Sequence, residues 1–207
     1  EIHERLVGSE MCIRDREMIN QGFQELLDSY LATKHRKKVE IITKAFNFAK
    51  QAHKGVKRRS GEPYIMHPIA VAKIVCTEIG LGSTSICSAL LHDVVEDTDY
   101  TVEDIENLFG PKIAQIVDGL TKISGGIFGD RASAQAENFK KLLLTMSDDI
   151  RVILIKIADR LHNMRTLQFM TPAKQKEKAK ETMDIYAPIA QRLGTVSYTH
   201  LRAHETL

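Results

Sequence analysis

The chain is organised around one stretch, which reads Ala89-Leu90-Leu91-His92-Asp93-Val94-Val95-Glu96-Asp97-Thr98-Asp99. Its apolar start is typical of a buried helix, and we expect the acids that follow to lie at the helix C-terminus, where the dipole disfavours negative charge. A divalent cation bound by His92 and Asp93, with Glu96 and Asp97 one turn further on, would offset that cost. A solvated acidic helix end is the alternative. The adjacent His-Asp pair after an apolar run favours the metal.

A second polar group lies within another apolar stretch. Asp159, Asn163 and Thr166 fall at i, i+4 and i+7, so they share one face of a predicted helix. Because isoleucine and leucine residues precede Asp159, that helix is expected to be buried, and a buried carboxylate needs a cation or hydrogen-bond donors. An ion pair with Arg160 or Arg165 meets this need as well as a metal does, and in isolation the two interpretations weigh about equally.

His67 stands directly before Pro68, at the expected start of a helix. By itself, a histidine in this position is more typical of a helix cap or a packed side chain than of a ligand. Combined with His92, Asp93 and Asp159, it completes a set of two imidazoles and two carboxylates. Such a set suits Mn²⁺, Fe²⁺ or Zn²⁺ in an open catalytic site.

A basic segment leads into His67. It contains Lys54, Lys57, Arg58 and Arg59, followed by Ser60. Guanidinium groups bind phosphates through paired N–H donors, and loop amides add to this binding. Charge runs are more often solvated than bound to a ligand. From these residues alone, a phosphate or nucleobase site and a solvated loop are therefore about equally supported interpretations. The position of the loop beside a predicted ligand favours binding.

Helical periodicity dominates the rest of the chain, and no segment has the period-two pattern of a strand. We expect helices over about 18–32, 39–53, 68–79, 83–96, 101–109, 112–123, 132–146, 149–169 and 172–193. Thr101 and Asp104 form a capping box at the start of one of them, and three glycines between 125 and 129 indicate a loop. Without an internal repeat, a compact all-α domain of eight or more helices is the simplest architecture.

The composition narrows the class of protein. A length of 207 residues suits one domain, and 29 basic against 27 acidic residues give a net charge of +2, too balanced for a whole-surface nucleic-acid binder. The three cysteines form no CxxC pair, which argues against a disulfide framework or a thiolate zinc site and favours the cytoplasm. No apolar run approaches the roughly 20 residues of a membrane span.

The two ends differ from the middle. Residues 1–16 and 196–207 lack its clean periodicity and are expected to be non-native flanks, so functional residues are sought in a domain over 17–195.

Three motifs follow one another along this domain: RRSGEPYIMHP at 58–68, LLHDVVEDT at 90–98 and IRVILIKIADRLHNMRTL at 150–167. Over about 36–194 the chain resembles the hydrolase domain of the long RelA/SpoT-type (Rel) alarmone enzymes, part of the His-Asp (HD) phosphohydrolase superfamily. The resemblance implies a multi-helix HD-domain fold. It also implies hydrolysis of the 3′-pyrophosphate of guanosine tetra- or pentaphosphate, (p)ppGpp, to pyrophosphate and GDP or GTP, a reaction that controls the stringent response.

The resemblance also implies roles for single residues. One metal ion, Mn²⁺, would be bound by His67, His92, Asp93 and Asp159. Glu96 and Asp97 would orient or deprotonate the attacking water. The nucleotide would contact Arg58, Arg59, Ser60, Asn163 and Thr166. The role of His162 is left open, with support of a metal ligand as one candidate.

Members of this family continue downstream into a synthetase domain and regulatory domains, so the chain is expected to be part of a longer protein. The expected partner is guanosine tetra- or pentaphosphate, with neither a membrane nor direct nucleic-acid binding. Two alternatives stay open: an HD phosphohydrolase for another nucleotide, and a non-catalytic nucleotide-binding regulatory fragment.

Overall fold

The computed structural model describes residues 2–35, 37–124 and 149–194 of the chain. Within these ranges the regular secondary structure is helical, and the only extended pairing is a single antiparallel bridge between Lys57 and Pro63. The predicted all-α class is thus confirmed. The helix predicted over 132–146, and the glycine-rich loop before it, lie outside the described residues.

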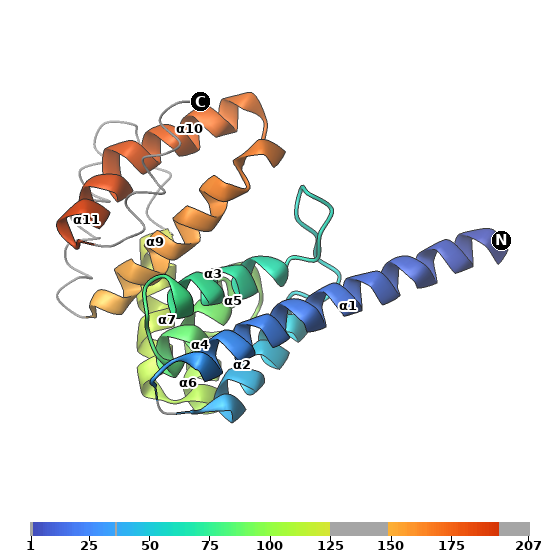
Figure 1. The fold of residues 1–207 in the computed structure, drawn as a ribbon, viewed down its shortest axis with the longest axis horizontal. Helices are drawn as coiled ribbons and strands as arrows, with labels where there is room; N and C mark the ends of the chain where they lie inside the picture. Colours follow the sequence, from blue (N-terminus) through green and yellow to red (C-terminus); the bar gives the residue numbers. More distant parts are fainter. Residues whose placement is uncertain (1, 36, 125–148, 195–207) are drawn as a thin grey trace.

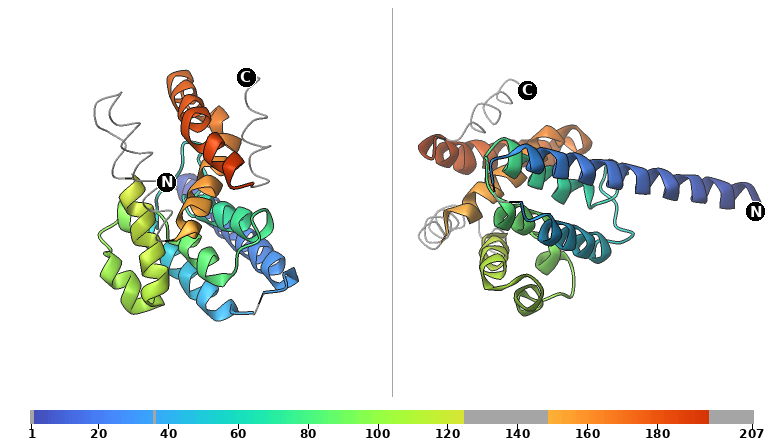
Figure 2. Two further views of the ribbon diagram at one scale, coloured as in Figure 1. Left: turned by 90° about the vertical axis from the view of Figure 1, so that its left-hand side faces the viewer. Right: turned by 60° about the horizontal axis from the view of Figure 1, so that its bottom comes forward.

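The helices enclose one apolar core (Figures 1 and 2). In chain order they are α1 (Ile2–Ala32), α2 (Val39–Ala52), α3 (Met66–Thr77), α4 (Ser83–Leu90), α5 (Val94–Asp97), α6 (Val102–Phe109), α7 (Pro111–Ser124), α9 (Ile150–Arg165), α10 (Pro172–Glu181) and α11 (Ala187–Arg192). A 3₁₀ turn, η1, covers Leu167–Phe169, and a π-helical turn, η2, covers Thr182–Tyr186. The predicted capping box of Thr101 and Asp104 is present at the start of α6. Within the described ranges, no helix is both long and apolar enough to cross a membrane.

The prediction of one helix over 83–96 was wrong. Helix α4 ends at Leu90, and a short turn separates it from α5. The break occurs because the His92 ring nitrogen Nδ1 lies 2.7 Å from the Ala89 carbonyl oxygen, which a continuing helix would offer to a backbone N–H. Asp93 therefore sits at the N-cap of α5, and the acids after it begin a helix instead of ending one.

Other helix boundaries also differ from the prediction. The helix predicted over 149–169 ends at Arg165 and is followed by η1. The helix predicted over 18–32 begins at Ile2, and its first half projects beyond the other helices (Figure 1). The foreign origin of residues 1–16 stays a prediction, and Asp15 within them forms a 3.0 Å ion pair with Lys57. The helix predicted over 172–193 is interrupted by η2, which ends two residues before Pro188, a residue that lacks the N–H an uninterrupted helix requires.

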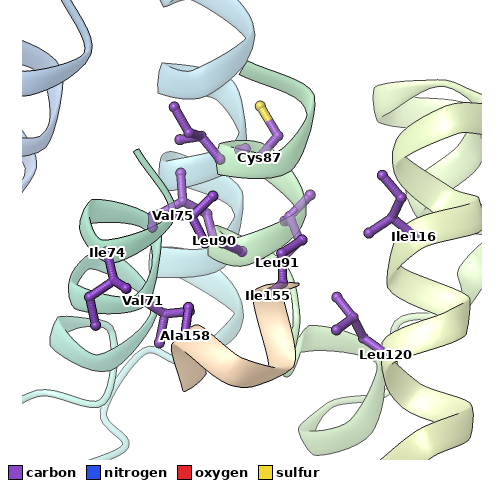
Figure 3. Close-up of a cluster of buried hydrophobic side chains, with 14 of the residues drawn as sticks. Val71, Ile74, Val75, Cys87, Leu90, Leu91, Ile116, Leu120, Ile155 and Ala158 are labelled. Atoms are coloured by element: carbon purple, nitrogen blue, oxygen red, sulfur yellow. The ribbon is translucent and has the colours of Figure 1, made fainter. Parts of the chain in front are cut away.

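Helix α4 lies at the centre of the core, packed against α2, α3, α7 and α9. Every residue from Ser85 to Leu90 is buried. Figure 3 shows Leu90 and Leu91 among apolar side chains from α3, α7 and α9. Burying a leucine side chain contributes about 1.5–3 kcal/mol. The helix that leads into His92 and Asp93 is therefore firmly anchored in the core.

We expect Leu90→Ala to lower the free energy of unfolding by about 2–5 kcal/mol, because Leu90 is fully buried and its truncation leaves a cavity. The matched control is Leu108→Ala on α6, where the side chain is 39% exposed and the loss should stay within about 0.5 kcal/mol. Urea unfolding followed by circular dichroism measures both changes. Equal losses in the two variants would contradict the central position of α4.

Candidate metal centre

His92 is fully buried in the turn between α4 and α5. Its Nδ1 lies 2.7 Å from the Ala89 carbonyl oxygen, and since a carbonyl can only accept, Nδ1 carries the hydrogen. In the neutral ring Nε2 is then an unprotonated acceptor. Nε2 lies 3.0 Å from Asp93 Oδ2 and 4.0 Å from Asp159 Oδ1, and it is buried without a hydrogen-bond partner. A lone pair that faces two carboxylates is repelled unless a cation lies between them.

His67 is placed in the same way from the opposite side. It lies in the first turn of α3, with its side chain 5% exposed. Its Nε2 is 3.1 Å from Asp159 Oδ1 and 3.8 Å from Asp93 Oδ2. Its Nδ1 is 2.8 Å from Nδ1 of His162, on α9. One side of the ring therefore faces the carboxylates, and the other side is held by a second histidine.

Arg58 determines which nitrogens carry hydrogen in this pair. Its Nη1 lies 3.2 Å from His162 Nδ1, and a guanidinium group can only donate. His162 Nδ1 therefore accepts, and His67 Nδ1 must carry the hydrogen that lies between the two rings. Burial lowers the pKa of His162 to about 3, with His67 and Arg58 adding to the effect, so this ring stays neutral. In the neutral His67 ring, Nε2 then carries a lone pair toward Asp159.

The two imidazole lone pairs and the two carboxylates form one cluster. Ligand atoms of His67, His92 and Asp159 all lie within 4.8 Å of one another, and Asp93 Oδ2 is 3.0 Å from His92 Nε2. Ligands bound to one metal at about 2.0–2.2 Å lie roughly 3–4 Å apart. The four side chains therefore fit a divalent cation, and the donor set matches the one predicted from the sequence. Their role as ligands stays a prediction.

The pKa values of the side chains in the cluster also indicate that a positive charge is favoured at this position. Burial lowers the pKa of His92, but the Asp93 and Asp159 carboxylates outweigh it and raise that pKa to about 9. Burial opposes ionisation of Asp93 and Asp159, yet the histidines hold the pKa of both carboxyls well below its usual range. A bound proton thus fills the position that suits a metal ion.

Neither arginine proposed as an ion-pair partner for Asp159 serves it. Arg160 forms a 2.8 Å ion pair with Glu181, and Arg165 donates to both carboxylate oxygens of Glu78 at 2.7 and 2.9 Å. The Asp159 Oδ1 atom accepts instead from Nδ2 of Asn163, at 2.7 Å. This arrangement weighs against the ion-pair interpretation.

Tyr64 was missed in the sequence. Its hydroxyl donates to Asp93 Oδ2 at 2.6 Å, and burial raises its pKa, with Asp93 and Asp97 adding to the rise. The buried ring of His53 packs on it, with ring centroids 4.7 Å apart. The only signal was its place inside the motif at 58–68, between the basic segment and His67, since no spacing relates a loop tyrosine to an aspartate about 30 residues later.

The predicted nucleotide residues lie beside this cluster. A shallow pocket is lined by Arg58, Arg59, Ser60, Thr166, Phe169 and Met170. Asn163 joins it through its Oδ1, which accepts from Nη2 of Arg58 at 3.3 Å. Phe169, about half exposed, is a pocket residue that the sequence did not indicate. The structure therefore brings together two of the three motifs here, although the roles of these residues stay predictions.

Glu96 and Asp97 are both exposed, on the short helix α5. Asp97 approaches the cluster through Tyr64, whose pKa it helps to raise. The two acids therefore lie on the solvent side of the His-Asp turn.

A helical domain with a buried cluster of two histidines and two aspartates defines a His-Asp type of metal centre. Residues 45–196 match the family model described as HD domain, and the chain belongs to this family. The predicted resemblance to the hydrolase domain of RelA/SpoT-type enzymes is confirmed as well.

Curated relatives make the likeness more specific. The chain is 47% identical over 174 residues to the bifunctional (p)ppGpp synthase/hydrolase SpoT of Escherichia coli, covering 84% of this chain and 24% of that protein. It is 51% identical over 156 residues to the guanosine-3′,5′-bis(diphosphate) 3′-pyrophosphohydrolase of Vibrio cholerae, covering 75% and 22% of the two chains. The chain thus spans about a quarter of the length of these relatives.

Among solved structures, the fold is similar to a metazoan ortholog of SpoT described as hydrolysing ppGpp, with a TM-score of 0.69 and 25% identity. The match covers 84% of this chain and 100% of the metazoan chain.

We expect Mn²⁺ at about 100 times its Kd to raise the free energy of unfolding by about 2.7 kcal/mol, because the folded cluster binds it and the unfolded chain does not. His92→Ala removes a ligand and should abolish both the gain and the bound metal, measured by thermal unfolding and elemental analysis. The control is His35→Ala, since this exposed ring contacts the Gly80 carbonyl and forms no hydrogen bond with the cluster among the described residues. Metal content that survives in His92→Ala would contradict the site.

Proposed function

We propose that the chain hydrolyses the 3′-pyrophosphate of guanosine tetra- or pentaphosphate, with one divalent metal held by His67, His92, Asp93 and Asp159. The observation that carries the proposal is the convergence of two buried imidazole Nε2 atoms and two largely buried carboxylates in one cluster. The pocket with Arg58 and Arg59 beside this cluster, and the names of the relatives, support the choice of substrate.

When bound, the metal supplies a Lewis acid that polarises the phosphate and makes water a better nucleophile. Side chains of the protein transfer the protons that the reaction requires. Glu96 and Asp97 accept a proton from the attacking water, whose oxygen forms the new bond to phosphorus. The bond from that phosphorus to the ribose 3′ oxygen breaks, and a proton returns to this oxygen, which gives pyrophosphate and GDP or GTP.

The pocket residues bind and orient the nucleotide. Arg58 and Arg59 pair with phosphate oxygens and offset the charge that builds up on them. Asn163, near the end of α9, and Thr166, at the C-cap of that helix, contact the sugar and base. Arg59 and Ser60 are carried by the loop whose turn requires Gly61, at a φ of 86°.

Pyrophosphate release from guanosine tetraphosphate in the presence of Mn²⁺ tests the proposal. We expect turnover by the chain and none by His92→Ala or Asp93→Ala, with helicity retained in both variants. A panel of other nucleotides tests the alternative HD activity, and faster turnover of one of them would contradict the substrate. Nucleotide binding without turnover at saturating Mn²⁺ would favour the non-catalytic fragment.

We expect Glu96→Gln and Asp97→Asn each to lower kcat by about 10²–10⁴-fold, because each removes a group that accepts a proton from water. Metal content should stay unchanged, since neither side chain belongs to the proposed ligand set. Glu103→Gln, on the neighbouring helix α6, is the matched control and should keep full activity. A parallel loss of metal would instead make these acids ligands.

The choice of Mn²⁺ over other divalent ions, the cytoplasmic location and the downstream synthetase and regulatory domains belong to the same proposal. Measuring turnover with Mn²⁺, Mg²⁺, Fe²⁺ and Zn²⁺ in turn tests the first of these.

A further inference from the structure

Arg58 is joined to two proposed metal ligands by two separate hydrogen-bonded paths. Its Nη1 lies 3.2 Å from His162 Nδ1, which lies 2.8 Å from Nδ1 of His67. Its Nη2 donates to Asn163 Oδ1 at 3.3 Å, and Asn163 Nδ2 donates to Asp159 Oδ1 at 2.7 Å. One guanidinium thus reaches a histidine ligand and a carboxylate ligand, each through a single intermediate side chain.

On the path through His162, two N–H donors compete for one acceptor atom. An unprotonated imidazole nitrogen has one lone pair, and two N–H groups, from Arg58 and His67, approach the same Nδ1 atom. Each hydrogen bond is therefore weaker than it would be alone. If Arg58 turns to another acceptor, the lone pair serves His67 only.

The intermediates and the arginine differ in how firmly they are held. His162 and Asn163 lie on α9, whose apolar face is buried in the core, and the Thr166 hydroxyl donates to the His162 carbonyl oxygen at 3.0 Å. Arg58 lies on a loop, and it also lines the pocket. A phosphate in that pocket offers Arg58 a stronger, charge-assisted acceptor than a neutral imidazole.

We propose that His162 is a positioning residue that couples nucleotide binding to metal binding. An anionic phosphate that draws Arg58 away leaves His162 Nδ1 to His67, which makes the His67 ring a more basic ligand and tightens the metal. The same movement takes a positive charge away from the ligand cluster. By linkage, the metal must tighten the nucleotide by the same factor. This inference rests on the proposed placement of the nucleotide at Arg58.

Calorimetric titration of Mn²⁺ with and without saturating GDP measures the coupling. GDP carries no 3′-pyrophosphate, so the proposed reaction does not consume it. In the unsubstituted chain we expect GDP to tighten Mn²⁺ binding about fivefold or more, as is usual for coupled sites. His162→Leu should weaken Mn²⁺ binding by about 10–100-fold, the range for lost support of a ligand, and should bring the GDP effect close to none.

Two further variants separate coupling from simple support. His162→Asn places an amide oxygen near the position of Nδ1 and should restore the GDP effect. Tyr64→Phe removes the hydroxyl that supports Asp93 but has no contact with Arg58 among the hydrogen bonds of the described residues, so it should weaken Mn²⁺ binding and leave the GDP effect intact.

The outcomes are distinct from those that test hydrolysis. The inference is overturned if GDP leaves Mn²⁺ affinity unchanged in the unsubstituted chain, or if the GDP effect is the same in His162→Leu. The unsubstituted chain could show the GDP effect and yet release no pyrophosphate from guanosine tetraphosphate. If the effect is then lost in His162→Leu, the inference is upheld and the proposed reaction is contradicted.

Discussion

The fold depends on one electrostatic constraint, which is that two imidazole lone pairs and two carboxylates converge in a buried space. His67 Nε2 and His92 Nε2 face Asp93 and Asp159, and the four groups come from three parts of the chain. Isolated groups of this kind repel one another away from water, and burial without a cation is costly. Positive charge at this point is therefore needed by the folded state itself, whatever reaction the site performs.

The apolar core holds these groups in place against their repulsion. Helix α4 is buried from Ser85 to its end and packs against both α3, which carries His67, and α9, which carries Asp159. Its end delivers His92 and Asp93 at a break in the helix. Since each of these helices is fixed by core packing, the ligand atoms have little freedom to move apart. A rigid arrangement of this kind suits a metal centre, in which small displacements of a ligand weaken binding.

The sequence was informative where a local pattern carried the signal. Helical periodicity and the absence of strand patterns predicted the all-α fold, and the polar face of Asp159 and Asn163 appears as a hydrogen bond between them. The break after Leu90 was not predictable from propensity, because it depends on the His92 ring reaching the Ala89 carbonyl oxygen. A side chain that competes for a backbone acceptor leaves no mark in the periodicity.

The contacts of Tyr64 and of Arg58 were unpredictable for a different reason. Both side chains belong to a loop, and the partners of a loop residue are set by tertiary packing between segments as far apart as Arg58 and His162. The motif spacing marked these positions without relating them to one another. The sequence placed the basic segment next to His67, and family resemblance supplied the nucleotide roles, but no spacing argument related Arg58 to His162 and Asn163.

The polarity of the hydrogen bonds explains how the site is prepared before any metal arrives. In each ligand histidine, the nitrogen that carries hydrogen is set by a group that can take only one role in a hydrogen bond. The Ala89 carbonyl can only accept, and the Arg58 guanidinium can only donate. The first forces hydrogen onto Nδ1 of His92. The second forces His162 to accept and thus places hydrogen on Nδ1 of His67. In both rings Nε2 is therefore the nitrogen that faces the carboxylates, where it can bind either a proton or a metal ion. In one ring this polarity comes from the backbone and is permanent, and in the other it originates in a side chain that a phosphate can attract, so only His67 is open to control by the nucleotide.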